Sequence, residues 1–160
     1  MRINLMETEL GAKLGKRFAG LSMLIEQSAL PGPLKELVNI RASQINGCGF
    51  CLDMHTKDAT AAGEDPQRLH MVAAWREATV FTPAERAALA FTEEGTRLAD
   101  LHQGVSDATW AAVREHFDDE QLAALVMLVA MINAANRMNV ISQTPAGSYQ
   151  PGMFDALVKS

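Results

Sequence analysis

The chain has 160 residues, of which 48% are hydrophobic and 21% are charged, and its formal net charge is −5 at pH 7. This length and composition suit one soluble globular domain with a core of its own. We expect neither nucleic acid nor a membrane as a partner, because nucleic acids and anionic membranes attract a positive surface and the sequence has no run of Lys or Arg.

The cytoplasm is the expected compartment. The first seven residues carry charge before any apolar stretch can build, which argues against a signal peptide. The longest apolar run, 122–132, is too short to span a bilayer. In a reducing cytosol, a CxxC pair is more often catalytic, redox-active or metal-binding than a static disulfide.

Hydrophobic residues recur at helical spacing along almost the whole chain. The predicted helices cover residues 10–30, 34–45, 48–62, a short stretch from 65, and residues 82–101, 106–116 and 118–141. Gly and Pro residues separate the early segments, and Asp or Thr followed by Pro opens two of the others. Convincing strand alternation, repeats and linkers are absent. We therefore expect one all-α domain over residues 1–160, a bundle of about six to seven helices, with an extended tail at 144–160.

The segment 122–139 is apolar nearly all round, so it has to be buried, either in its own chain or against a second subunit. Buried polar groups need partners. We therefore expect hydrogen bonds at the polar end of this helix, which carries Asn133, Asn136, Arg137 and Asn139.

The two cysteines of the chain, Cys48 and Cys51, stand three residues apart, and His55 follows four residues after Cys51. In a helix these side chains share one face. The start of a helix stabilises a thiolate, and an imidazole one turn after Cys51 can accept its proton. The spacing also lets the two sulfurs join in a disulfide. We expect Cys51 to attack a substrate, and Cys48, exposed at the helix start, to resolve the product and exchange with an outside reductant.

Two other interpretations of the cysteines remain. Zinc accepts Cys and His ligands, but a closed site needs a fourth ligand, and the sequence has no second CxxC or HxxxH. The remaining histidines, His70, His102 and His116, are scattered singly. Alternatively, the cysteines are small apolar core residues beside a histidine with a satisfied hydrogen bond.

One pattern in the sequence resembles the core motif of the AhpD-like alkylhydroperoxidases. It consists of Glu36, eleven further residues, and then Cys48-x-x-Cys51-x-x-x-His55. That family lies within the carboxymuconolactone decarboxylase superfamily. Further segments that resemble the family are residues 40–48, 52–55, 73–77, 81–89 and 132–137. The resemblance covers most of the middle of the chain and the last helix.

The resemblance implies an all-helical AhpD-like fold, a homo-oligomer that is commonly a trimer or a hexamer, and a thiol peroxidase that reduces organic hydroperoxides without a bound cofactor or metal. It implies that Cys51 is the peroxidatic residue and passes through a sulfenic acid, and that Cys48 resolves it to a disulfide and donates a proton. His55, with Glu36 through a water, would deprotonate Cys51. An external dithiol of lipoyl or thioredoxin type would regenerate the thiols.

One position departs from the family pattern. The best-known members carry a histidine just before the second cysteine, where this chain has Phe50, so the site has one polar partner fewer. The decarboxylase branch of the superfamily does not depend on a CxxC pair, which argues against that reaction here. Two alternatives to a peroxidase stay open: a thiol–disulfide exchange protein, and a non-catalytic metal-binding or redox-sensing helical module.

Overall fold

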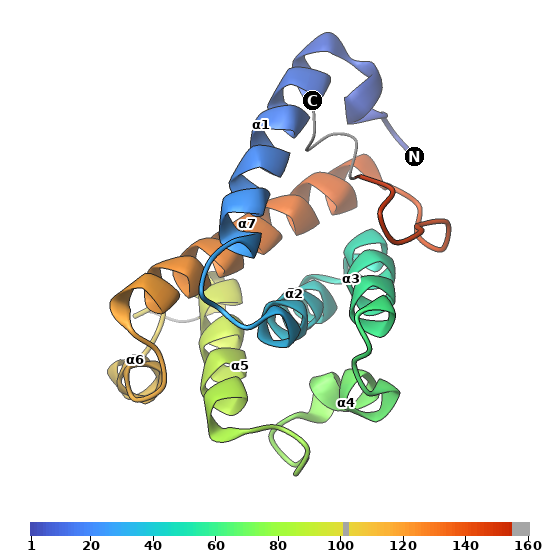
Figure 1. The fold of residues 1–160 in the computed structure, drawn as a ribbon. Coiled ribbons are helices and arrows are strands. Elements are labelled where there is room, and N and C mark those ends of the chain that lie inside the picture. Colours follow the sequence, from blue (N-terminus) through green and yellow to red (C-terminus); the bar gives the residue numbers. More distant parts are fainter. Residues whose placement is uncertain (101–102, 155–160) are drawn as a thin grey trace.

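The computed structural model describes residues 1–100 and 103–154, and this part of the chain contains helices and no strand (Figure 1). The predicted all-α fold class is confirmed. Its α-helices are α1 (Glu9–Glu26), α2 (Gly32–Asn46), α3 (Gly49–Ala61), α4 (Pro66–Met71), α5 (Pro83–Thr96), α6 (Asp107–Arg114) and α7 (Asp119–Ser142). Short 3-10 turns lie at Leu5–Glu7, Val72–Ala74 and Leu98–Asp100.

Helix α2 lies at the centre of the fold and packs against α3, α5 and α7 (Figure 1). Its residues Leu37, Val38 and Ile40 are completely buried. One apolar cluster joins α2 to α5, α6 and α7, and a second joins it to α3, α4 and α5. A third, smaller cluster of Ala42, Cys48, Cys51 and Ile132 lies where α2, α3 and α7 meet. The two cysteines are therefore core residues of this junction.

Two predicted helices end earlier than expected. The first, predicted to residue 30, ends at Glu26. The buried ammonium group of Lys35 donates to the carbonyl of Glu26 and so satisfies one of the free acceptors at this end. Helix α5 ends at Thr96, and its predicted end at Leu101 falls outside the described residues.

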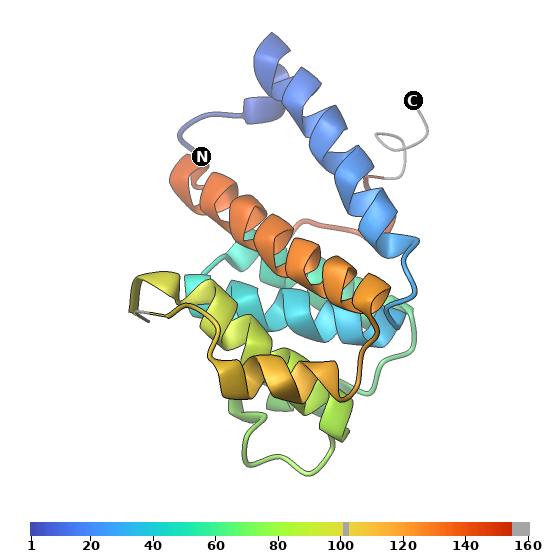
Figure 2. The same ribbon diagram turned by 90° about the vertical axis from the view of Figure 1, so that its left-hand side faces the viewer.

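Helix α1 leans away from the other helices and meets α7 near its own C-terminal end (Figure 2). One face of α1 therefore leaves large apolar side chains exposed, namely Leu10, Leu14, Leu21 and Leu24. Helix α7 also exposes Val126, Met127, Met138, Val140 and Ile141. By length and composition alone α7 could cross a membrane, and about a third of that apolar window is buried inside the chain. Its predicted burial is thus only partly achieved within one protomer.

After α7, residues 144–154 run back along α3 without helical structure. The carboxylate of Asp53 accepts hydrogen bonds from the backbone N–H groups of Gly147, at 2.8 Å, and Tyr149, at 3.2 Å. The ammonium of Lys57 donates to the carbonyl of Tyr149 at 2.8 Å. The ring of Tyr149 is buried, and its hydroxyl donates to Asp58 at 2.9 Å. These contacts attach the segment to α3. Residues 155–160 of the predicted extended tail lie outside the described residues.

Candidate active site: a buried dithiol beside a histidine–glutamate pair

A sharp turn between α2 and α3 sets the position of the first cysteine. Gly47 ends α2 in the left-handed conformation, with φ of 65°, which glycine adopts without a steric cost. Cys48 follows at once as the N-cap residue of α3. Its Sγ accepts the backbone N–H of Cys51 at 3.5 Å, the role that a Ser or Asp oxygen usually plays. The sulfur of Cys48 therefore sits at the positive end of a helix.

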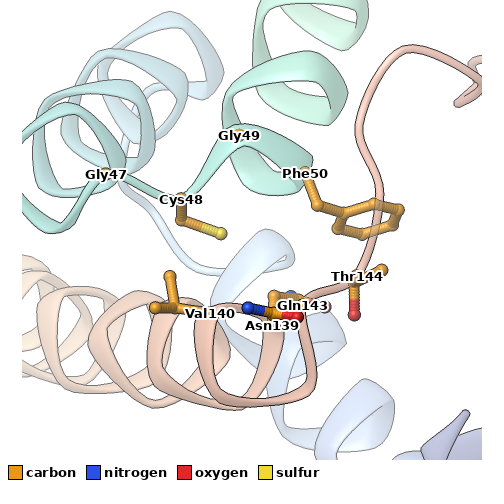
Figure 3. A pocket seen from close by; sticks show the side chains of 8 residues that line it. All are labelled: Gly47, Cys48, Gly49, Phe50, Asn139, Val140, Gln143 and Thr144. Atoms are coloured by element: carbon orange, nitrogen blue, oxygen red, sulfur yellow. The ribbon is translucent and has the colours of Figure 1, made fainter. Parts of the chain in front are cut away.

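Both cysteines are free thiols, and each is only 1% exposed. The expected exposure of Cys48 at the helix start is wrong, because the C-terminal half of α7 lies across that start. Cys48 nevertheless faces a pocket of about 210 Å³ between α3 and α7 (Figure 3). The pocket is lined by Gly47, Cys48, Gly49, Phe50, Asn139, Val140, Gln143 and Thr144.

The ionisation of each thiol depends on the other. The pKa of Cys48 is lowered to about 6, chiefly because the thiol of Cys51 hydrogen-bonds to it. Burial opposes this shift, and the backbone N–H of Cys51 adds to it. The same hydrogen bond between the thiols, together with burial, raises the pKa of Cys51. In the singly ionised pair the negative charge therefore rests on Cys48, and Cys51 keeps its proton.

His55 and Glu36 lie together and contact each other directly, whereas the resemblance implies a contact through a water. Nδ1 of His55, on α3, is 2.9 Å from Oε2 of Glu36, on α2. Their side chains are only 12% and 19% exposed, so water competes weakly for the contact. A carboxylate in this position orients the ring and favours a proton on Nδ1. A Coulombic interaction with His55 is among the smaller causes of the lowered pKa of Cys48.

Two amides of α7 complete the surroundings of the sulfurs. Nδ2 of Asn139 lies 3.5 Å from Sγ of Cys51, and the amide of Asn136 lowers the pKa of both cysteines. Asn136 is held in place by an amide hydrogen bond from Asn46, at 2.9 Å, and by its own bond to Ser43, at 3.0 Å. The predicted hydrogen bonding of this polar helix end is confirmed. Its contact with the thiols is not visible in the sequence, where the only signal is a set of amides on an otherwise apolar helix.

The geometry adds no support for the zinc interpretation of the cysteines. Within residues 1–100 and 103–154, no three His, Cys, Asp or Glu side chains are arranged so that they could hold a metal ion. Together, the buried CxxC pair, the His55–Glu36 contact and the helical fold match the AhpD-like pattern.

Comparison with known proteins gives the same assignment. Residues 12–94 match the model of the carboxymuconolactone decarboxylase family. The chain belongs to this family. Its relatives include the uncharacterized protein YdfG of Bacillus subtilis (strain 168), which is 41% identical over 123 residues, or 77% of this chain and 82% of YdfG. The chain is thus an AhpD-like member of the carboxymuconolactone decarboxylase superfamily.

Solved structures share the fold of this carboxymuconolactone decarboxylase family member. A protein of unknown function from Agrobacterium tumefaciens, described as a candidate antioxidant defence protein AhpD, has a TM-score of 0.84 and 31% identity, covering 92% of this chain and 99% of its own. The debrominase Bmp8 has a TM-score of 0.77 at 19% identity, covering 94% of this chain and 77% of its own. The fold therefore serves at least one established enzyme.

Proposed function

We propose that this protein is a thiol-dependent peroxidase that reduces organic hydroperoxides through a dithiol–disulfide cycle of Cys48 and Cys51. The observation that carries the proposal is that two free thiols are buried together at the start of one helix, where their interaction lowers the pKa of Cys48. A peroxide needs a thiolate to attack it, and a second thiol at hydrogen-bond distance turns the product into a disulfide.

The first half of the cycle transfers oxygen to Cys51. Its sulfur attacks the terminal oxygen of the hydroperoxide while its proton passes to the Cys48 thiolate. The O–O bond breaks, Cys51 becomes a sulfenic acid, and the leaving alkoxide takes the proton from Cys48 to form the alcohol. Cys48 is thereby a thiolate again, beside a sulfenic acid.

The second half closes and reopens the disulfide. The Cys48 thiolate attacks the sulfur of the Cys51 sulfenic acid, forms the S–S bond and releases hydroxide, which takes a proton to become water. An external dithiol then reduces the disulfide through a mixed disulfide and is itself oxidised. The pocket-facing position of Cys48 supports Cys48 as the sulfur that the reductant attacks, because Cys48 lines the pocket and Cys51 does not.

The His55–Glu36 pair helps to stabilise the negative charge on the thiols during the cycle. The Coulombic interaction with His55 favours the thiolate of Cys48, and Glu36 keeps the His55 ring oriented. Phe50 and Val140 give the pocket apolar walls, while Asn139, Gln143 and Thr144 are polar. A small pocket with both kinds of lining suits an alkyl hydroperoxide, whose apolar body and polar peroxide group need different surroundings.

The test is direct. The purified protein, mixed with cumene hydroperoxide and dithiothreitol, should consume peroxide catalytically, and without dithiothreitol one equivalent of peroxide should remove both free thiols. Cys51→Ser should abolish turnover, and Cys48→Ser should leave a sulfenic acid that dimedone traps. If both thiols remain free after peroxide is added, the peroxidase function is refuted.

A thiol–disulfide exchange protein is the second candidate function. The lowered pKa of Cys48 and its position at the pocket favour it, because a thiolate at the start of a helix attacks disulfides as well as peroxides. Rate constants for the reduced protein with cumene hydroperoxide and with oxidised lipoamide separate the two. A much faster reaction with the disulfide would favour the exchange protein.

We also propose a cytoplasmic homo-oligomer, a trimer or a hexamer, as the working assembly. The exposed apolar faces of α1 and α7 support it, because monomeric proteins rarely leave large contiguous apolar surfaces in water. A second copy of the chain would bury the part of α7 that its own protomer leaves uncovered. Light scattering on the purified protein gives the number of subunits.

A further inference from the structure

We propose that Asn139 is a catalytic residue, whose side-chain amide stabilises the negative charge that develops on the Cys51 sulfur during its attack on peroxide. This inference rests on the proposed peroxidase function and assigns a role to a residue outside the CxxC–histidine–glutamate motif. It is based on the contact of the amide with the reacting sulfur, the position of Asn139 in the pocket and the fixed orientation of its amide.

Cys51 needs amide donors because its burial and the neighbouring thiol both oppose its ionisation, and Asn139 adds to the effect of Asn136. Its side chain is 1% exposed, so water cannot solvate a thiolate there. The neighbouring charge on Cys48 opposes a second negative charge at short range. Nδ2 of Asn139, at 3.5 Å from Sγ of Cys51, replaces part of the missing solvation.

The orientation of the amide is fixed by its second hydrogen bond. Nδ2 of Asn139 also donates to the carbonyl oxygen of Ala135, one turn earlier in α7, at 3.1 Å. A carbonyl oxygen accepts only from the NH₂ group of an amide, so the other hydrogen of that group is directed to the sulfur. The donor is therefore in place before any substrate arrives, which is the condition for electrostatic catalysis.

Asn139 also connects the sulfur with the pocket. It is a lining residue of the 210 Å³ pocket, opposite the start of α3, and Figure 3 shows its side chain on the α7 wall below Cys48 and Phe50. A peroxide in this pocket would lie against Cys48 and Asn139, and the amide of Asn139 contacts the sulfur of Cys51. Asn139 also takes part in ending α7, but through its backbone: its carbonyl oxygen accepts the N–H of Gln143. The side-chain amide is not used for that purpose.

The experiment uses the Cys48→Ser protein, in which Cys51 is the single thiol and the introduced serine hydroxyl can still cap α3. The rate of alkylation by iodoacetamide between pH 5 and 11 gives the ionisation midpoint of Cys51. Adding Asn139→Leu, which keeps the side-chain size but removes the donor, should raise that midpoint by about one pH unit, a tenfold loss of thiolate at neutral pH. Met138→Leu, beside Asn139 on α7 but outside the pocket lining, is the matched control and should leave the midpoint unchanged.

The same variants report on peroxide chemistry. Sulfenic acid formation at Cys51 with cumene hydroperoxide, measured with dimedone, should slow about tenfold at pH 7 in Asn139→Leu and recover towards the parent rate at high pH. If Asn139→Leu does not fold, Asn139→Ser provides the comparison, since it shortens the side chain and withdraws it from the sulfur. An unchanged midpoint with normal peroxide reactivity would overturn the role of Asn139. A shifted midpoint without any sulfenic acid would instead support the contact and refute the peroxidase function.

Discussion

Nδ1 of His55 lies 2.9 Å from Oε2 of Glu36, although the two residues are nineteen positions apart in the sequence and lie on different helices. The packing of α3 on α2 brings them together, and neither side chain is more than a fifth exposed. In such surroundings a carboxylate fixes both the direction and the proton position of the ring.

Replacing Glu36 by Gln should therefore weaken catalysis without unfolding the protein. Gln keeps the size of the side chain but removes the charge that stabilises an imidazolium. We expect peroxide turnover with dithiothreitol to fall about tenfold or more. The control is Glu77→Gln, an exposed carboxylate far from the thiols along the chain, which should keep full turnover. Equal turnover of both variants would remove Glu36 from the site.

The ionisation of Cys48 gives a pH prediction. Because the pKa of Cys48 is lowered to about 6, its alkylation rate should rise between pH 5 and 7 and then level off. An ordinary thiol would continue to gain reactivity up to pH 8 to 9, near its unperturbed pKa of about 8.5. Peptide mapping by mass spectrometry after brief treatment with iodoacetamide identifies the modified cysteine and its midpoint.

The same measurement on Cys51→Ala provides the control. This substitution removes the thiol that donates to Cys48, the largest cause of its lowered pKa, so the midpoint should move upward. A midpoint near 8.5 in the unsubstituted protein, or first modification at Cys51, would contradict the charge distribution described here.

A buried ion-pair network around Glu93 stabilises the fold away from the thiols. The carboxylate accepts from Nε1 of Trp75 at 2.9 Å and from guanidinium nitrogens of Arg41 and Arg76, both at 2.6 Å. Burial alone would raise the pKa of Glu93, but these three donors more than offset it and hold the pKa below its ordinary value. The group is therefore ionised in the folded protein at neutral pH.

Glu93→Gln should lower the free energy of unfolding by about 3 kcal/mol, because Arg41 is left partly buried without its counter-charge. Urea unfolding at pH 7 measures the loss. The contribution of a carboxyl group with a lowered pKa is complete above its unfolded pKa and disappears as the pH falls through the folded pKa. The difference between the two proteins should therefore shrink in acid. A constant difference from pH 7 to pH 3 would show that the charge is not its source.

The exposed apolar face of α1 gives a prediction about assembly. Leu14 is 60% exposed and lies in a stripe of leucines along α1. If a second copy covers this stripe, Leu14→Glu places a charge in an apolar interface and should shift the protein from an oligomer towards the 17.3 kDa chain. Light scattering after gel filtration measures the mass. Gln67→Glu, an exposed position on α4, is the control, and equal masses for both variants would exclude α1 from the interface.

The helical fold could be predicted because its signals are local. Thr82 and Glu85 form the capping box that opens α5, and Gly47 ends α2 because glycine adopts the left-handed backbone there without a steric cost. The CxxC spacing likewise shows two thiols within reach of each other, since three residues on one helix cover a fixed distance. Helix boundaries were less predictable, as the early end of α1 depends on the tertiary contact of Lys35.

What only the tertiary structure decided is the environment of the sulfurs. The sequence determines that Cys48 caps α3, but burial of both thiols depends on the C-terminal half of α7, where Asn139 stands 88 positions after Cys51. The amide of Asn139 meets Cys51 for the same reason. A local pattern records which groups share one helix, whereas ionisation and access depend on solvent and on charges that arrive from distant segments. The sequence alone thus determined the fold class and the closeness of the two thiols, and packing decided how deeply they are buried and which amides reach them.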